Sequence, residues 1–176
     1  TLASAGGDAV AVIGYLDQGG KGIIQGSLDS GAFDKFILSD GMIGDSLTDA
    51  FGKDLNKSFG SLPGSTGKGE GVFTGVAKAA GIDSSGPYTG ESYDAAALIV
   101  LAMQAGNSAD RSSIAKNVMA VANGPGTKIY PGELKKALDL LAKGKKVDYE
   151  GATGVALTSV GEAEGSFLEQ EVKGGK

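Results

Sequence analysis

The chain has 176 residues, 41% of them hydrophobic and 21% charged, with a formal net charge of −5. This composition is typical of a globular protein, and an acidic chain without a clustered basic stripe argues against a nucleic-acid partner. Cysteine and histidine are absent, which excludes disulfides, a thiolate nucleophile, an imidazole base and the common zinc ligand sets. No cofactor and no metal site are therefore expected.

The first third of the chain predicts strands that alternate with helices. The expected elements are strand 8–15, helix 19–32, strand 35–38, a helix from 45 to 55, and strand 58–62. Glycine is abundant, at 31 residues without a collagen-like period, so the glycines mark tight turns between short elements. Crossovers this short favour right-handed parallel pairing, and the sequence therefore predicts an α/β fold.

The remainder of the chain is mainly helical. A Gly/Ser/Lys loop is expected over 65–71, followed by a helix that ends at Gly81 and a loop over 83–90. Three helices are then expected over 92–105, 108–122 and 131–142, and two strands, 154–158 and 166–172, form a terminal hairpin around an acidic turn. The helical block needs a sheet to cover, and we expect that sheet to lie outside this chain.

Three motifs resemble catalytic or ion-binding patterns but lack the residues or spacing that those patterns need. Residues 44–47 read Gly-Asp-Ser-Leu, as in one class of hydrolases, but no histidine follows to activate the serine, so a helix start is favoured. The glycine-rich segment 67–71 lacks the spacing of a phosphate-binding loop. The carboxylates between 148 and 171 show no calcium-loop spacing and favour a solvated face. An enzyme is not expected.

Tyr15 and Asp40 are better candidates for function. Tyr15 ends the first expected strand and Asp40 directly follows the second. Ligands of parallel sheets bind outside the carboxyl ends of the strands, and neighbouring strands are only about 5 Å apart. An aspartate there suits an ammonium group, and a tyrosine offers a ring face and a hydroxyl. The alternative is structural: a helix-capping aspartate and a half-buried tyrosine.

Several segments, taken in order, resemble one known family. They are 8–15 (DAVAVIGY), 19–20 (GG), 30–42 (SGAFDKFILSDGM), 86–96 (GPYTGESYDAA), 145–154 (KKVDYEGATG) and 171–173 (EVK). They resemble the periplasmic solute-binding proteins of branched-chain amino acid ABC transporters, the Leu/Ile/Val-binding type, over nearly the whole chain. The sequence departs from that family after Tyr15, where Leu16-Asp17 replaces a frequent Pro-Glu, and in the acidic turn 161–165.

The resemblance implies a type I periplasmic-binding-protein fold: two lobes with parallel sheets, with the ligand between them. Residues 1–82 would form most of the C-terminal lobe, 83–152 would cross back into the helical part of the N-terminal lobe, and 153–176 would return as a terminal β-hairpin. The rest of the N-terminal lobe would be missing, so the chain would be the C-terminal half of a longer protein. In such a protein Tyr15 and Asp40 would bind the ligand, and Gly86, Pro87, Tyr88 and Gly90 would form part of the hinge.

The same resemblance implies a function. The protein would be a monomer in the periplasm, or outside the membrane of a Gram-positive cell, binding an amino acid or related small solute and delivering it to the membrane permease of an ABC importer. The alternative is a ligand-sensing regulator or receptor ectodomain of the same fold, of the amide-binding type. An amino terminus with a secretory signal would favour the importer.

Overall fold

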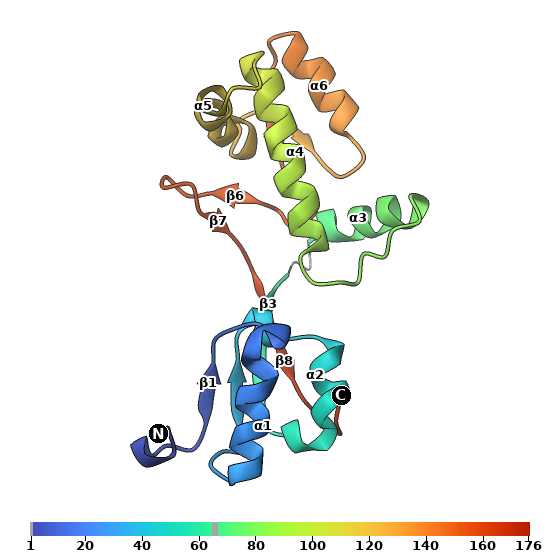
Figure 1. Cartoon of the computed structure of the whole chain (residues 1–176). Helices are drawn as coiled ribbons and strands as arrows, with labels where there is room; N and C mark the ends of the chain where they lie inside the picture. The colour runs from blue at the N-terminus through green and yellow to red at the C-terminus, as the bar shows by residue number, and fades with distance from the viewer. Residues whose placement is uncertain (1, 65–66) are drawn as a thin grey trace. The chain divides into compact units, whose positions relative to one another are not determined.

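The computed structural model describes residues 2–64 and 67–176, and the chain divides into two compact units. The first unit comprises Thr1–Pro63 and Phe167–Lys176, and the second comprises Gly64–Ser166 (Figure 1). Strands and helices alternate in the first unit, whereas helices dominate the second. The predicted α/β class is confirmed.

A mixed sheet forms the centre of the first unit. Its strands, in spatial order, are β1 (Val10–Val12), β2 (Phe36–Leu38), β3 (Phe59–Pro63) and β8 (Phe167–Glu171). The first three strands run parallel, with Val12 opposite Leu38, and β8 runs antiparallel to β3. The parallel pairing expected for the short crossovers is therefore present.

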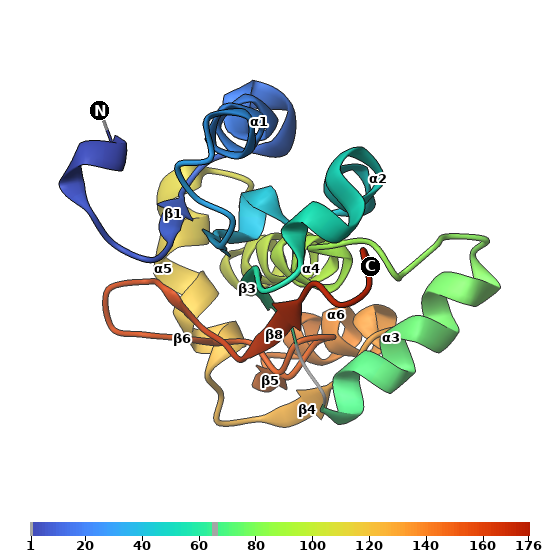
Figure 2. The ribbon, with the colours of Figure 1, turned by 90° about the horizontal axis from the view of Figure 1, so that it is seen from below.

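Two helices, α1 (Lys21–Ser30) and α2 (Asp45–Phe51), cover one face of this sheet (Figure 2). Alternate residues of β1 and β2 point toward the helices and are buried, as the period of two along a strand requires. The buried core residues are Val10, Val12, Ile24, Phe36, Leu38, Met42, Leu47 and Leu55. On the opposite face Ile37 is 41% exposed, so the helices cover only one side of the sheet.

Short helical turns complete the first unit. They are η1 (Leu2–Ala5), η2 (Leu16–Gly20), η3 (Asp40–Met42) and η4 (Gly52–Leu55). The turn η2 begins four residues after the end of β1, and η3 begins two residues after the end of β2, so both lie at the carboxyl ends of two paired parallel strands. Tyr15 directly precedes η2, and Asp40 is the first residue of η3.

The second unit packs helices around small strand pairs. Its helices are α3 (Lys68–Ala79), α4 (Thr89–Gly106), α5 (Arg111–Ala122) and α6 (Leu134–Ala142). The strands β4 (Thr127–Ile129) and β5 (Val147–Tyr149) pair in parallel, and β6 (Ala156–Leu157) pairs antiparallel with β7 (Ala163–Glu164). No helix in the described part of the chain is long and apolar enough to span a membrane.

The core of the second unit forms where α4 meets α5, α6 and the β4–β5 pair. Its buried residues are Ala97, Leu98, Leu101, Ala102, Val121, Ala122, Ile129, Ala137, Val147 and Tyr149. Helix α3 joins this unit through the ring of Phe73, whose centroid lies 5.3 Å from that of Tyr93 on α4. The other side of α4 stays open, with Ile99 48% and Val100 44% exposed.

The structure differs from the sequence-based expectation at three places. Helix α3 begins at Lys68, so the expected loop over 65–71 is helical from there on, while residues 65 and 66 lie outside the described residues. The strands β4 and β5 were not predicted. The terminal hairpin is formed by β6 and β7, whereas β8 pairs with β3, because five residues of β8 can pair with that strand edge and only two pair within the hairpin.

The two compact units also divide the chain at other residues than the expected lobes. The units separate at 63/64 and 166/167, whereas the family resemblance implied lobe boundaries near 82 and 152. Helix α3 accounts for the first difference, because it packs against the second unit through Phe73 and Ala77. The assignment of the lobes of a whole protein stays a prediction.

Candidate functional site

The candidate site lies where β1 and β2 end. Val12 and Leu38 face each other in the last register position of the two strands, and the Ser39 N–H donates to the Val12 carbonyl at 3.1 Å. The pairing of β1 with β2 therefore continues one step beyond the strands. It brings the residues that follow, Tyr15 and Asp40, to the same edge of the sheet.

A serine fastens the two strand ends together. The Ser39 hydroxyl accepts a hydrogen bond from the Gly14 N–H at 3.2 Å and donates to the Gly14 carbonyl at 3.3 Å. Gly14 directly precedes Tyr15, and Ser39 directly precedes Asp40. This side chain thus holds the two loops side by side, and sequence reasoning missed it because a lone serine carries no local signal.

The ring of Tyr15 lies against the η3 loop. A Cβ atom on Gly41 would lie 2.8 Å from Cδ1 and 3.0 Å from Cε1 of Tyr15, so the absence of a side chain at Gly41 makes room for the ring. The Tyr15 carbonyl accepts the N–H groups of Gln18 at 3.3 Å and Gly20 at 3.1 Å, which fixes the turn that follows. Tyr15 is nevertheless 64% exposed, so most of its surface is available to a ligand.

Asp40 begins the η3 turn and is exposed. Its Oδ1 accepts the N–H of Gly41 at 2.9 Å, and its backbone carbonyl accepts the N–H of Ile43 at 3.1 Å. These bonds fix the backbone around the carboxylate. An exposed carboxylate and an exposed phenol ring at the same edge of a sheet can bind a small cationic group, such as an ammonium.

The predicted hinge residues lie at the start of α4. Gly86 and Pro87 are exposed and precede the helix, and Tyr88 takes a left-handed φ of 63° immediately before the first helical residue. Gly90 lies inside α4, where a Cβ would meet the Ala152 and Thr153 side chains at 3.4 Å. The four residues therefore have different surroundings, and their role as a hinge stays a prediction.

The structure also shows the environment of the other motifs. Residues 44–47 form the start of α2, as expected for a helix start. Within 2–64 and 67–176, no three His, Cys, Asp or Glu side chains are grouped closely enough to hold a metal ion.

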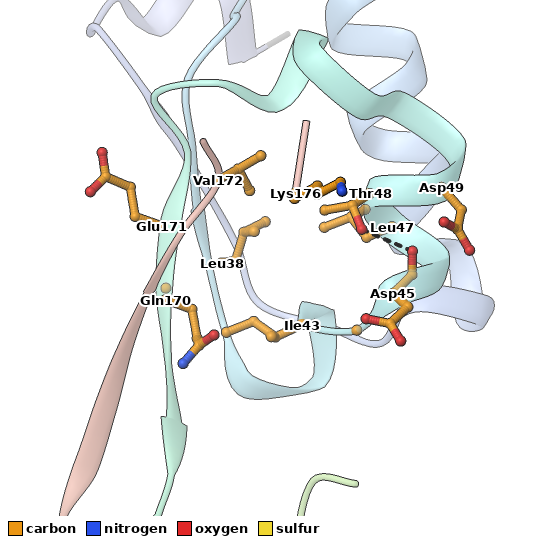
Figure 3. Close-up of a pocket in the computed structure, with 12 residues that line it drawn as sticks. Leu38, Ile43, Asp45, Leu47, Thr48, Asp49, Gln170, Glu171, Val172 and Lys176 are labelled. Atoms are coloured by element: carbon orange, nitrogen blue, oxygen red, sulfur yellow. Dashed lines mark hydrogen bonds between the residues drawn. The ribbon is translucent and has the colours of Figure 1, made fainter. Parts of the chain in front are cut away.

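A groove of about 470 Å³ lies between α2 and the end of β8 (Figure 3). Its apolar lining comprises Leu38, Ile43, Leu47 and Val172, and its polar lining comprises Asp45, Thr48, Asp49, Gln170, Glu171 and Lys176. Neither Tyr15 nor Asp40 is among its lining residues. Sequence reasoning missed this groove, because it depends on the docking of β8 beside β3 and segments far apart in the chain line it.

Comparison with solved structures defines the fold. The chain has an α/β fold of the type 1 periplasmic-binding-protein class, and it corresponds to part of the length of those proteins. It is similar to a leucine-binding protein, LivK, of Thermotoga maritima MSB8, with a TM-score of 0.64 and 18% identity over 96% of this chain and 42% of that one. It is also similar to a type 1 periplasmic binding protein of Bordetella pertussis Tohama I, with a TM-score of 0.52 and 16% identity over 92% of this chain and 46% of that one.

One sequence relative is closer in identity. Over 87 residues the chain is 37% identical to BasB of Halobacterium salinarum, a substrate-binding protein of a chemotactic signal transduction system; the match covers 49% of this chain and 21% of BasB. The chain thus spans less than half the length of each of these proteins. No protein-family model matches it.

Proposed function

We propose that this chain is part of a solute-binding protein that binds an amino acid or a related small solute at the ends of β1 and β2. In this proposal Asp40 pairs with the ligand's ammonium group and Tyr15 packs on the ligand backbone. The whole protein would work outside the cytoplasmic membrane, in the periplasm or its equivalent, and deliver the solute to an ABC permease. It would carry its ligand without changing it chemically.

One observation carries the proposal. Tyr15 and Asp40 follow paired parallel strands and stay exposed, while the Ser39 hydroxyl bridges to Gly14 between them. This is the edge at which ligands of parallel sheets bind. The fold supports the proposal further, since the structural neighbours are named as a leucine-binding protein and a periplasmic binding protein.

A second candidate function is ligand sensing, and it has an observation of its own. The relative with 37% identity, BasB, is a substrate-binding protein of a chemotactic signalling system. The same amino-acid site could then report to a transducer instead of a permease. Two measurements in a strain lacking the gene separate these functions: uptake of radiolabelled amino acid, which falls if the protein feeds a permease, and swimming toward that amino acid, which is lost if it feeds a transducer.

The binding site is tested by isothermal titration calorimetry of the full-length gene product with leucine and other aliphatic amino acids. We expect Asp40→Ala to weaken binding by about 2–5 kcal/mol, because the ligand's ammonium group would be buried without its partner. Tyr15→Ala should weaken binding less, since the ring contributes contact surface but no opposite charge.

Asp45→Ala is the matched control. It removes another acidic residue of the same unit, one that lines the groove between α2 and β8 and not the strand ends. We expect its affinity to equal that of the unchanged protein. The site assignment fails if Asp40→Ala binds as well as the unchanged protein. A loss of affinity in Asp45→Ala alone would indicate that the ligand binds in the groove.

A further inference from the structure

Asp94 is a buried carboxylate that the proposed ligand site does not use. It lies in α4 and is 2% exposed. Its Oδ1 accepts hydrogen bonds from the Tyr149 hydroxyl at 2.9 Å and the Ala152 N–H at 2.7 Å. Its Oδ2 accepts bonds from the Thr153 N–H at 2.9 Å and the Thr153 hydroxyl at 2.7 Å. These donors belong to the end of β5 and the turn that follows it.

Both carboxyl oxygens of Asp94 must act as hydrogen-bond acceptors. Each oxygen of Asp94 faces one backbone N–H, from Ala152 or Thr153, and a backbone N–H can only donate. An ionised carboxylate accepts on both sides, whereas an amide would turn its NH₂ group toward one of the two N–H groups. The ion pairs of the described residues do not include Asp94, so N–H and O–H dipoles compensate its charge.

Tyr149 is suited to remain a donor in this network. Burial raises the pKa of the Tyr149 hydroxyl well above its usual range, and the nearby Asp94 charge and hydrogen bond raise this pKa further. The hydroxyl therefore keeps its proton at all ordinary pH values and continues to donate to the carboxylate. The hydrogen bond from Tyr149 to Asp94 therefore does not depend on pH over this range.

Glycines bring the surrounding backbones into direct contact. Gly151 takes a left-handed φ of 60°, and a Cβ there would overlap the Asp94 carboxylate. A Cβ on Gly69, in the first turn of α3, would overlap the Gly151 carbonyl and lie 2.8 Å from the Ala152 carbonyl. A Cβ on Gly90 would lie at an ordinary contact distance of 3.4 Å from the Ala152 and Thr153 side chains. The starts of α3 and α4 therefore both contact the turn after β5, and the approach is tightest at Gly69 and Gly151.

We propose that Asp94 is a positioning residue that locks these three segments into one rigid joint, composed of Gly69, Gly90, Asp94 and residues 151–153. The joint would be fixed within the second unit, so Gly90 would not take part in bending. Gly86 and Pro87 connect α3 to α4, which the joint holds together, so motion that accompanies ligand binding would instead use the chain after Gly154. Only this last step rests on the proposed function.

Hydrogen–deuterium exchange of the 176-residue chain without ligand tests the joint. In Asp94→Asn we expect exchange of the amides in 150–155 and in 89–94 to rise together by about tenfold or more, because the isosteric amide breaks the contacts between both segments. Exchange in the cores of α5 and α6 should stay unchanged, which separates loss of the joint from general destabilisation of the unit. Asp139→Asn, an exposed acid of α6, is the matched control and should change neither segment.

Two milder variants keep the test decisive if Asp94→Asn does not fold. Thr153→Val and Tyr149→Phe each remove one hydroxyl donor and leave the backbone N–H bonds in place, so each should raise exchange in both segments by a smaller factor. The joint is refuted if the variants that fold leave both segments as protected as in the unchanged chain, or if 150–155 alone responds. Because the exchange is measured without ligand, coupled exchange in the chain together with no amino-acid binding by the full-length gene product would refute the proposed function and leave the joint standing.

Discussion

Asp40 and Asp94 are acidic residues of the same chain in opposite situations. Asp40, in the first unit, is exposed at the end of a strand, where a solute can reach it from solvent. Asp94, in the second unit, is 2% exposed, and donors of its own chain approach both of its oxygens within 2.7–2.9 Å. The difference lies in the surroundings and not in the side chain itself.

This contrast shows that burial and internal hydrogen bonding determine the role of an aspartate in the fold. A carboxylate surrounded by internal donors contributes to stability and fixes backbone geometry, since its acceptor capacity is used within the protein. A carboxylate at the surface contributes little to folding and stays available to a ligand. Each substitution below should therefore affect either binding or stability, but not both.

The largest effect on stability is expected for Asp94→Ala. The change leaves the buried Ala152 N–H and Tyr149 hydroxyl and the half-buried N–H and hydroxyl of Thr153 without an acceptor, and each unsatisfied buried donor costs about 1–3 kcal/mol. Allowing for relaxation, we expect the free energy of unfolding of the second unit to fall by about 3–5 kcal/mol. Urea unfolding followed by far-ultraviolet circular dichroism measures this loss.

Asp40→Ala is the counterpart of that experiment. Its carboxylate is exposed, so we expect the free energy of unfolding to change by less than about 0.5 kcal/mol. Equal losses for Asp40→Ala and Asp94→Ala would contradict the division of labour between the two acids.

The sequence was sufficient to predict that Tyr15 and Asp40 lie at the same edge of a parallel sheet. Strands β1 and β2 have short apolar runs, and their parallel pairing follows from the short crossovers, so Tyr15 and Asp40 could be placed at one edge before any coordinates. The helices of the second unit were also predicted from local pattern, because their apolar residues recur at helical spacing.

The joint around Asp94 could not be predicted in this way. Tyr149 and Thr153 lie 55 and 59 residues away from Asp94 in the sequence, and no local pattern links them. Strand β4 was missed because Thr127 and Lys128 are exposed and give it no apolar periodicity. Strand β8 is exposed along its whole length, so its partner is set by the free edge of β3 and not by its own side chains.

A pair of glycines in α3 tests how tightly the joint is packed. In Gly69→Ala the new methyl group would overlap backbone atoms of Gly151 and Ala152, which cannot swing away as a side chain can. We expect a loss of about 1–3 kcal/mol in the free energy of unfolding, as is usual for overpacking.

Gly71→Ala, in the same helix, should change the free energy of unfolding in the opposite direction. Its Cβ would have no atom within 4 Å, so the substitution should stabilise the helix by up to about 1 kcal/mol. Thermal unfolding of the two variants side by side measures both effects. If Gly69→Ala stabilised the chain as Gly71→Ala does, the turn after β5 would have room to move, and the joint would not be rigid.

The last effect concerns the stability of the chain at alkaline pH. Burial raises the pKa of Tyr149 in the folded chain above its ordinary value of 10.0. Below pH 10 the hydroxyl is protonated in both the folded and unfolded states and the free energy of unfolding does not depend on it. Above pH 10 the unfolded chain loses this proton while the folded chain keeps it, so stability falls as pH rises, by about 1 kcal/mol over the first pH unit.

Tyr149→Phe removes this titration. Its free energy of unfolding should be lower at neutral pH, through the lost hydrogen bond to Asp94, but should decline less steeply above pH 10 than that of the unchanged chain. Urea unfolding at matched pH values on both sides of pH 10 measures the two slopes, and the other titrating groups cancel in the comparison. Parallel slopes would mean that solvent reaches the Tyr149 hydroxyl in the folded state, and a solvent-accessible hydroxyl is incompatible with the closed network that makes Asp94 differ from Asp40.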